Sequence, residues 1–228
     1  MTVSLASFQK NKAVHARSLA LRAVWKFIGL PILRSPVLYG TSWRVLLLKL
    51  FGAHIEEGVQ IKTGVRVTAP WLLRIGTHSW IGEDCWIDNM AMVTIGNDVC
   101  ISQGVYLCTG NHDWGDPTFR MFASEITLGD GCWIASKSVL APGVTIGKNA
   151  IAGIGSVVSS SIPPDLIYSG NPASFRAVRT LATAPPKDRL DQIVSPKPPA
   201  RTDGLAQLTT DSSNTNAASV TAELVFPR

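Results

Sequence analysis

His112 is the residue of this chain best suited to proton transfer, and it stands in the segment Thr109-Gly110-Asn111-His112-Asp113. An imidazole group titrates near neutral pH, so a histidine can take a proton from a hydroxyl group and return it later. A lone histidine is more often structural than catalytic. The prediction of a catalytic base at His112 therefore depends on the elements that position this side chain.

Those elements repeat every six residues between residues 55 and 158. One position in six is Ile, Leu or Val in fourteen of fifteen cases, and four positions later the residue is small in twelve cases. The repeated positions are Ile55, Ile61, Val67, Ile75, Ile81, Ile87, Ile95, Ile101, Leu107, Leu128, Ile134, Leu140, Ile146, Ala152 and Val158. Neither an α-helix nor a lone alternating strand keeps this register, so the repeat predicts an all-β parallel β-helix of short strands and corners.

Three six-residue units close one coil, and coils begin at residues 55, 75, 95, 128 and 146, which gives about five coils. The interval of 33 residues between 95 and 128 contains a long insertion after Leu107. Asn111 falls where a small inward residue is expected, so the register fails just before His112. We expect residues 108–127 to form a catalytic loop without secondary structure, because long loops of this kind are usually functional.

Charge divides the chain into a basic beginning and a slightly acidic remainder. Residues 1–55 contain eight Lys or Arg residues and no Asp or Glu, within a chain whose net charge is +5. Apolar clusters in residues 1–54 predict a basic, partly helical cap over the first coil, which protects an open sheet edge. Contact with an anionic membrane surface or a lipid-linked substrate is compatible with this cap. No nucleic-acid motif accompanies the charge, so we expect no nucleic-acid partner.

The other composition signals favour a cytoplasmic protein, with peripheral contact at the inner face of the membrane as an option. No run of eighteen apolar residues and no secretory cleavage site are present. The four cysteines, Cys85, Cys100, Cys108 and Cys132, have no metal-site or disulfide-framework spacing. His54 lies three coils, about 14 Å, from the level of His112, so three histidines cannot converge on one metal, and we expect none. Residues 183–228 have the composition of a disordered tail.

Together these residues resemble the hexapeptide-repeat acyltransferases, whose fold is a left-handed β-helix. Within that family the resemblance is strongest to colanic-acid-type acetyltransferases and to maltose, galactoside and nodulation-factor acetyltransferases, and it covers about residues 20–180. The matching segments are Trp43-Arg44 to Phe51-Gly52-Ala53, Trp86-Ile87-Asp88-Asn89, Ile101-Ser102-Gln103-Gly104, Leu107 to Asp113, Trp133-Ile134-Ala135, and Tyr168-Ser169-Gly170-Asn171-Pro172-Ala173. The segment with His112 is the most specific of them for sugar O-acetyl transfer.

The resemblance implies a homotrimer that moves an acetyl group from acetyl-CoA to a sugar or glycoconjugate hydroxyl, with exopolysaccharide biosynthesis as the setting. His112 is then the general base for direct attack, without an acyl-enzyme. The acceptor sugar is expected at Asp88 and Asn89, which corner chemistry explains equally well. Asp113 and Trp114 are further expected substrate contacts. Ser102 and Thr109 are interpreted as structural.

The resemblance also implies that acetyl-CoA binds along the last coils and the segment 163–182. The expected contacts are Ala135, Ser136, Lys137, Gly153, Ile154, Arg176 and Arg179. This chain has Ile154 where relatives often have Ala, and it has Ser160 and Ser174 where they often have Lys. Arg176 and Arg179 are thus the nearest cations for the CoA phosphates, with Lys137 and Lys148 as further candidates.

Two alternatives remain open at this point. A serine acetyltransferase shares the repeat, although it normally carries a larger helical N-terminal domain than the roughly 50 residues available here. A non-catalytic β-helix that serves as an assembly scaffold would also explain the repeat. It would leave the chemistry around His112 without a purpose.

Overall fold

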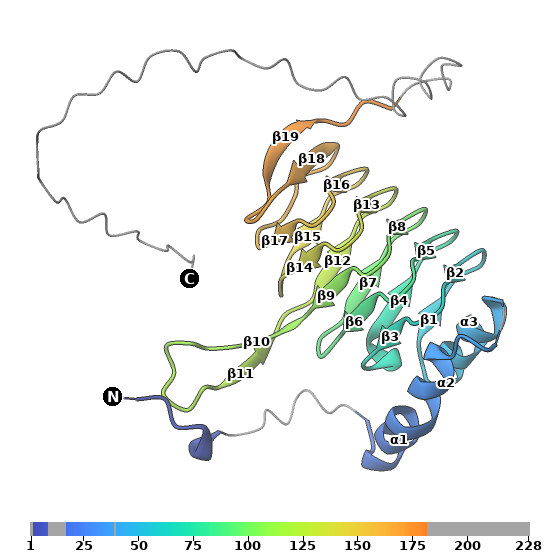
Figure 1. Ribbon diagram of the computed structural model, residues 1–228, viewed down its shortest axis with the longest axis vertical. Coiled ribbons are helices and arrows are strands. Elements are labelled where there is room, and N and C mark those ends of the chain that lie inside the picture. Colours follow the sequence, from blue (N-terminus) through green and yellow to red (C-terminus); the bar gives the residue numbers. More distant parts are fainter. Residues whose placement is uncertain (1, 9–16, 39, 182–228) are drawn as a thin grey trace, which may run out of the picture. The chain divides into compact units, whose positions relative to one another are not determined.

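The computed structural model of the protein describes residues 2–8, 17–38 and 40–181 (Figure 1). The predicted disordered tail, residues 183–228, lies outside this range. A helical cap comes first, a three-sided β-helix follows, and a two-stranded arm leaves the β-helix at its third coil (Figure 1).

Three parallel sheets form the sides of the β-helix. Sheet A contains β1 (His54–Ile55), β4 (Leu73–Ile75), β7 (Val93–Ile95), β12 (Ile126–Leu128) and β15 (Thr145–Ile146). Sheet B contains β2 (Gln60–Ile61), β5 (Trp80–Ile81), β8 (Cys100–Ile101), β13 (Trp133–Ile134), β16 (Ile151–Ala152), β18 (Leu166–Ser169) and β19 (Ser174–Val178). Sheet C contains β3 (Arg66–Val67), β6 (Trp86–Asp88), β9 (Tyr106–Cys108), β14 (Val139–Leu140) and β17 (Val157–Val158).

Five complete coils stack in this way, which confirms the predicted left-handed β-helix. A sixth coil begins where Ile162 bridges to Ile146 and β18 pairs with β16. The last strand, β19, then turns back antiparallel to β18. Every one of the fifteen repeat positions is buried, with at most 4% of its surface exposed. The aliphatic repeat therefore fills the interior of the prism from end to end.

The small residues of the repeat sit at the corners, where their polar atoms bond to the next coil. Ser79 Oγ donates to the carbonyl of Gly96 over 2.7 Å, and Ser138 Oγ donates to that of Gly153 over 2.8 Å. Cys85 and Cys132 are buried free thiols, as predicted. Burial raises the pKa of Cys85 to about 11 and that of Cys132 to about 12, so both stay protonated at neutral pH.

Three edges join the sheets, and we name them AB, BC and CA by the sheets that each connects. Edge CA carries all three insertions: residues 68–72, which include the 3-10 turn η4 (Pro70–Leu72), residues 89–92, and the long segment after Cys108. Edges AB and BC keep the regular six-residue spacing. Any functional role of the three insertions is therefore located along edge CA.

The long insertion is a β-hairpin, so the prediction of a loop without secondary structure was wrong. Strand β10 (Gly110–His112) pairs antiparallel with β11 (Met121–Ala123), and His112 lies opposite Met121. Thr109, not Asn111, takes the interior corner position: Thr109 is fully buried whereas Asn111 is exposed. The Thr109 hydroxyl accepts hydrogen bonds from the amides of Met90 and Ala91 and donates to the carbonyl of Asp88. We call residues 110–123 the arm (Figure 1).

The helices between residues 19 and 50 form the predicted cap over the first coil, whereas Phe8, earlier in the basic N-terminal segment, lies beside His112 of the arm. The cap comprises α1 (Leu19–Val24), a π-helical turn η3 (Trp25–Gly29), α2 (Leu30–Arg34) and α3 (Ser42–Leu50), and a short 3-10 turn, η1 (Leu5–Ser7), precedes them. The Ser18 hydroxyl caps α1 by accepting from Leu21 N. Trp25 is buried, and its indole N–H donates to the carbonyl of Val67 over 2.9 Å, which ties the cap to sheet C.

The buried guanidinium of Arg44 holds the end of the cap together. Arg44 donates to the backbone carbonyls of four residues, Leu33, Ser35, Leu38 and Gly40. Burial lowers its pKa, and the four carbonyls supply the partners that such a buried charge requires.

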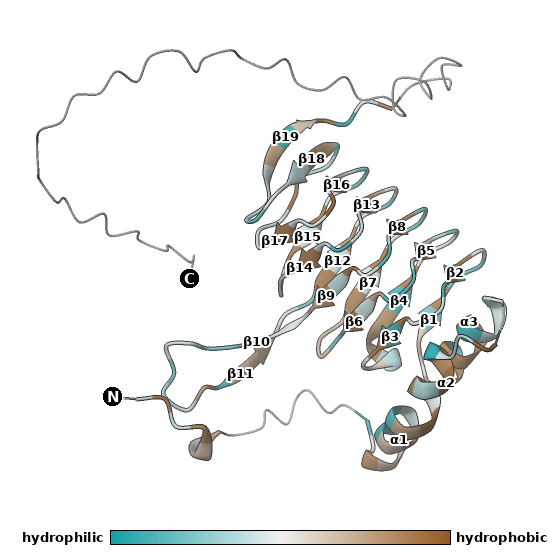
Figure 2. Ribbon diagram, viewed as in Figure 1, coloured by the Kyte–Doolittle hydropathy of each residue, from teal (hydrophilic) through white to brown (hydrophobic). Residues whose placement is uncertain are grey.

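Apolar and polar residues alternate along the cap helices (Figure 2). Among the described helices none has the length and apolar character that crossing a bilayer demands.

Candidate active site

His112 projects from the arm, and a backbone carbonyl fixes its tautomer. Its Nδ1 lies 2.8 Å from the carbonyl oxygen of Phe119, and the two rings stack at 4.1 Å between centroids with an angle of 8°. A carbonyl oxygen only accepts hydrogen bonds, so Nδ1 must carry the proton. In the neutral imidazole the lone pair therefore resides on Nε2, which is the arrangement a general base requires.

A tight turn at the tip of the arm presents this carbonyl. Phe119 has a φ of 52°, and its amide donates to the carbonyl of Asp116 over 2.8 Å. The Asp116 carboxylate accepts from both the amide and the hydroxyl of Thr118, and these bonds lower its pKa. Because the turn is closed by these bonds, the Phe119 carbonyl has a defined place opposite His112.

The two acidic residues of the arm share one arginine. Arg120 Nη2 lies 3.4 Å from Asp113 Oδ2, and Arg120 Nε lies 3.4 Å from Asp116 Oδ2. The predicted substrate contact Asp113 therefore has a structural partner within the arm, although its side chain stays partly accessible. Trp114, the other predicted contact on the arm, is 79% exposed.

Asp88 lies on edge CA, at the end of β6 and beside the base of the arm. Its Oδ1 accepts from the Thr68 hydroxyl over 2.8 Å, and its Oδ2 accepts from the Tyr106 hydroxyl over 3.1 Å. Burial raises the pKa of Tyr106, with Cys108 and Asp88 adding to the effect, so the phenol stays protonated and remains a donor. Tyr106 also stacks on Trp86 at 4.7 Å. A half-exposed carboxylate is thus held in one orientation on the outer surface.

Asn89, which the resemblance predicts to bind the sugar together with Asp88, points into the protein instead. It is fully buried, and its Oδ1 accepts from the Ala69 amide while its Nδ2 donates to the carbonyls of Ala69 and Leu72. These bonds hold the insertion at residues 68–72. The corner explanation therefore accounts for Asn89 in full, and Asp88 alone faces outward.

Six of the seven predicted CoA contacts gather along edge BC. Residues 135–137 and 153–154 form successive corners there, and the Gly155 amide donates to the carbonyl of Ser136 over 2.9 Å. Gly153 packs so closely on the next coil that an added Cβ would lie 2.7 Å from the Cβ of Ser169. Arg176 donates to the side-chain and backbone oxygens of Ser169, so this guanidinium lies at the same edge.

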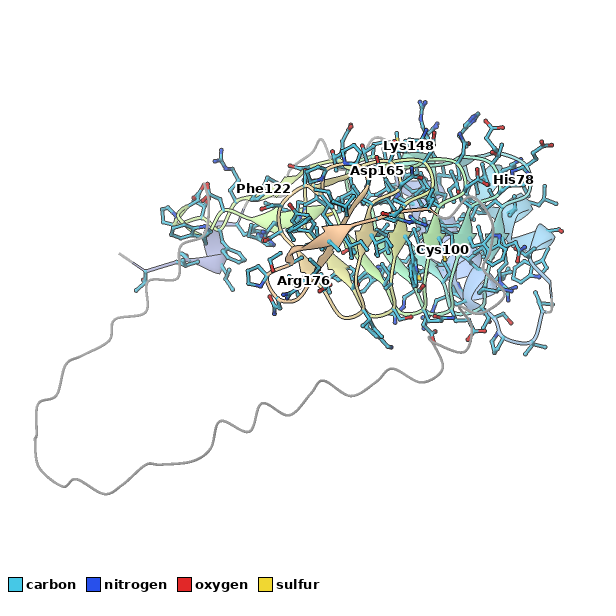
Figure 3. All side chains as sticks on the ribbon, turned by 90° about the horizontal axis from the view of Figure 1, so that it is seen from above. His78, Cys100, Phe122, Lys148, Asp165 and Arg176 are labelled. Carbon is cyan, nitrogen blue, oxygen red and sulfur yellow. The ribbon has the colours of Figure 1, made fainter. Side chains whose placement is uncertain are left out.

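Arg179 and Lys148 lie elsewhere. Arg179 Nη1 donates to the carbonyls of Gly131 and Asn149, which are corner residues of edge AB. Figure 3 shows Lys148 beside Asp165 on that edge, with Arg176 on the other side of the prism. Edge AB is separated from edge BC by the whole of sheet B, so within one chain Arg179 and Lys148 lie apart from Ser136 and Arg176.

The sequence of this chain is similar to those of known acetyltransferases. No family model matches the chain. The putative colanic acid biosynthesis acetyltransferase WcaF of Escherichia coli is 43% identical over 137 residues, which span 60% of this chain and 74% of that protein. This chain belongs to the hexapeptide-repeat acetyltransferases.

Two further relatives and one solved structure are also similar to this chain. The galactoside O-acetyltransferase of Escherichia coli is 31% identical over 141 residues, covering 60% of this chain and 68% of the relative. Nodulation protein L of Rhizobium meliloti is 31% identical over 139 residues, covering 59% and 75%. A solved galactoside acetyltransferase in complex with coenzyme A superposes with a TM-score of 0.63 at 25% identity, over 75% of this chain and 84% of that one.

A hexapeptide-repeat acetyltransferase of Vibrio cholerae complexed with acetyl coenzyme A shares the fold. Its TM-score is 0.67 at 22% identity, over 76% of this chain and 94% of that chain. The predicted family and the predicted β-helix are thereby confirmed. Two features of this acetyltransferase had no signal in the sequence: the Phe119 carbonyl opposite His112, and the hydroxyls of Thr68 and Tyr106 on Asp88. Each depends on a contact across the arm or between coils.

Proposed function

We propose that this acetyltransferase moves the acetyl group of acetyl-CoA to a hydroxyl of a sugar or glycoconjugate, in exopolysaccharide biosynthesis. The observation that carries the proposal is the hydrogen bond from His112 Nδ1 to the Phe119 carbonyl, because it leaves the lone pair of the neutral imidazole on Nε2. Transfer to oxygen is supported by the likeness to the galactoside O-acetyltransferase, and exopolysaccharide by the likeness to the colanic acid enzyme.

The reaction needs one base and no covalent intermediate. His112 Nε2 takes the proton of the acceptor hydroxyl while that oxygen attacks the thioester carbonyl. The tetrahedral oxyanion, held by a backbone N–H, collapses with loss of the CoA thiolate. The imidazolium then gives its proton to the thiolate, which restores the neutral base. None of the described contacts of His112 involves a Ser, Thr or Cys side chain, so no nucleophile–base pair is built here.

The acceptor and the donor have separate places in this proposal. Asp88 accepts hydrogen bonds from hydroxyls of the acceptor sugar, with Asp113 and Trp114 of the arm as further contacts. Acetyl-CoA lies along edge BC against Ala135, Ser136, Lys137, Gly153 and Ile154, with Arg176 as the cation for its phosphates. Asn89 is left out of the proposed site because its side-chain amide is fully used inside the protein. Arg179 is left out because its Nη1 is held at edge AB, away from the other contacts of the same chain.

A homotrimer would bring these places together. His112 belongs to edge CA and the CoA contacts to edge BC of the same chain, and the arm extends away from its own prism (Figure 1). Sheets B and C turn apolar side chains outward, among them Trp80, Trp133 and Trp86, whereas sheet A exposes His54, Arg74 and Thr127. A closed ring of three uses two different surfaces of each chain, so two apolar faces and one polar face suit it.

Measuring CoA release from acetyl-CoA with a panel of acceptors tests the function. The panel contains neutral sugars, an amino sugar and L-serine, so that it separates O-acetylation of sugars from N-acetylation and from serine acetylation. We expect release with at least one sugar hydroxyl and none with L-serine. Release with serine alone would establish the serine acetyltransferase alternative, and no release with any acceptor would favour the scaffold. The cytoplasmic location and the peripheral membrane contact stay predictions.

A further inference from the structure

An apolar pocket of about 680 Å³ opens between the helical cap, edge CA and the arm. Its walls include Leu19 and Phe27 from the cap, Trp71 and Met90 from edge CA, and Met121 from the arm. A volume of this size lies in the range of small-molecule sites. Phe27 and Leu19 are 71% and 77% exposed, so the apolar wall on the cap side is largely uncovered within the described residues.

Two residues that line the pocket are neighbours of the proposed catalytic base. Met121 is the residue paired with His112 across the hairpin, and Phe8, which also lines the pocket, has its ring 5.8 Å from that of His112. The pocket continues past Met90, whose amide is held by Thr109 at the base of the arm. A molecule that places a hydroxyl at His112 therefore has the pocket as the natural place for its remaining part.

Two cations line the same pocket and have no acidic partner there. Arg22 and Lys26 stand one turn apart at the junction of α1 and η3. No Asp or Glu occurs in residues 1–55, and none of the described ion pairs includes either cation. Cations beside an apolar pocket attract an anion that carries an apolar group, and phosphate is the common anion of this kind.

The wall also contains an unsatisfied donor. The indole Nε1 of Trp71 is buried and has no hydrogen-bond partner in the part of the chain that the structure describes. An unpaired buried N–H costs free energy, which an acceptor oxygen of a ligand could recover after a small movement of the wall. The pocket thus combines apolar walls, two cations and one free donor.

We propose that this pocket binds the apolar chain of a lipid-linked acceptor, with Arg22 and Lys26 contacting the phosphate that joins the chain to the sugar. The inference rests on the proposed function, because it is the sugar of this acceptor that meets His112. A free sugar has nothing to place in the pocket. An anionic membrane surface would meet the exposed cations of the cap without needing the pocket, and the test separates the two.

The test measures the binding of decyl phosphate, below its critical micelle concentration, by isothermal titration calorimetry. Inorganic phosphate and 1-decanol are the comparison ligands, since each has only one of the two features. Ala23→Phe narrows the pocket from the surface of α1, and the Arg22→Gln/Lys26→Gln pair removes its charge. Arg34→Gln/Lys49→Gln removes the same charge from exposed parts of the cap that do not line the pocket.

We expect decyl phosphate to bind the wild-type protein at least about tenfold more tightly than either comparison ligand, since chain and charge are recognised together. Ala23→Phe and the Arg22/Lys26 pair should each weaken it about tenfold or more, and the Arg34/Lys49 pair should leave it unchanged. Equal weakening by both charge pairs, or no effect of Ala23→Phe, would overturn the proposal. The CoA-release assay with free sugars tests the proposed function separately, so the two failures can be told apart.

Discussion

The carbonyl oxygen of Phe119 lies 2.8 Å from Nδ1 of His112, seven residues away across the arm. This contact makes the imidazole a defined base with its lone pair on Nε2. It depends on the hairpin, because β10 brings His112 and the turn at residues 116–119 brings the carbonyl.

Replacing His112 should abolish most turnover without unfolding the protein. We expect His112→Ala to lower kcat by about 10²–10⁴-fold, the range for a lost general base, because the side chain is on the arm and outside the core. Steady-state CoA release and thermal unfolding measure the two effects. His54→Ala and His78→Asn are the controls, with Asn chosen because His78 has a φ of 58°. A His112→Ala protein with more than about a third of wild-type turnover would contradict the mechanism.

Asp88 and Asn89 are neighbours with opposite roles, and variants should separate them. Asp88→Ala is expected to raise KM for the acceptor about tenfold with little change in thermal stability, because its carboxylate is on the surface. Asn89→Ala should cost about 2–4 kcal/mol of unfolding free energy, since it leaves the backbone groups of Ala69 and Leu72 unpaired inside the protein. Urea unfolding and acceptor kinetics provide the comparison. The same stability loss from both substitutions would remove the distinction.

Arg176 and Arg179 should separate in the same way. Arg176→Gln removes an exposed cation from edge BC. We expect a severalfold higher KM for acetyl-CoA, because an exposed ion pair with a CoA phosphate contributes about 0.2–1 kcal/mol to binding. The stability of the protein should stay unchanged. Arg179→Gln removes the bonds to Gly131 and Asn149, and should cost about 1–3 kcal/mol of stability at unchanged KM. An effect of Arg179→Gln on KM alone would return Arg179 to the CoA site.

The buried thiols predict a loss of stability at alkaline pH. Burial raises the pKa of Cys85 to about 11 and of Cys132 to about 12, from an ordinary value of 9.0. The native state therefore holds these protons more tightly than the unfolded chain. Their contribution to the free energy of unfolding is complete below pH 9.0. It falls as the pH rises from 9.0 to about 11 for Cys85 and to about 12 for Cys132. Each thiol lowers the free energy of unfolding by at most about 1.4 kcal/mol for each pH unit in its range.

Comparison with a Cys85→Ala/Cys132→Ala variant isolates this effect from the titration of Tyr and Lys. Urea unfolding between pH 8 and about pH 10.5 should show a shallower decline for the variant than for the wild type. Alanine suits the interior corner, as Ala150 occupies the equivalent place in another coil. Parallel declines for the two proteins would show that the thiols do not titrate as their burial requires.

The sequence predicted the prism well because its repeat is local and every coil imposes the same demand. Ile61, Ile134 and the other repeat positions each need only the next coil to be buried. The arm was missed because two strands of three residues have too little periodicity to detect. The position of Arg179 at edge AB could not be predicted because its partners Gly131 and Asn149 are 48 and 30 residues away in the chain. Asn89 was ambiguous because an amide suits both a corner and a sugar.

Mixing two inactive variants tests whether each site is shared between chains. His112→Ala removes the base, and Ser136→Trp fills edge BC without touching the core; each must first prove inactive alone. If a site takes His112 from one chain and edge BC from its neighbour, then in randomly mixed trimers about a quarter of the sites combine two intact halves. Co-refolding the two variants in equal amounts should therefore restore about a quarter of wild-type CoA release. A site built within one chain could never be restored by mixing, because each chain would still carry its own defect. Absence of recovery in mixed assemblies, verified by a tag on one variant, would thus refute the shared site even if the protein is a trimer.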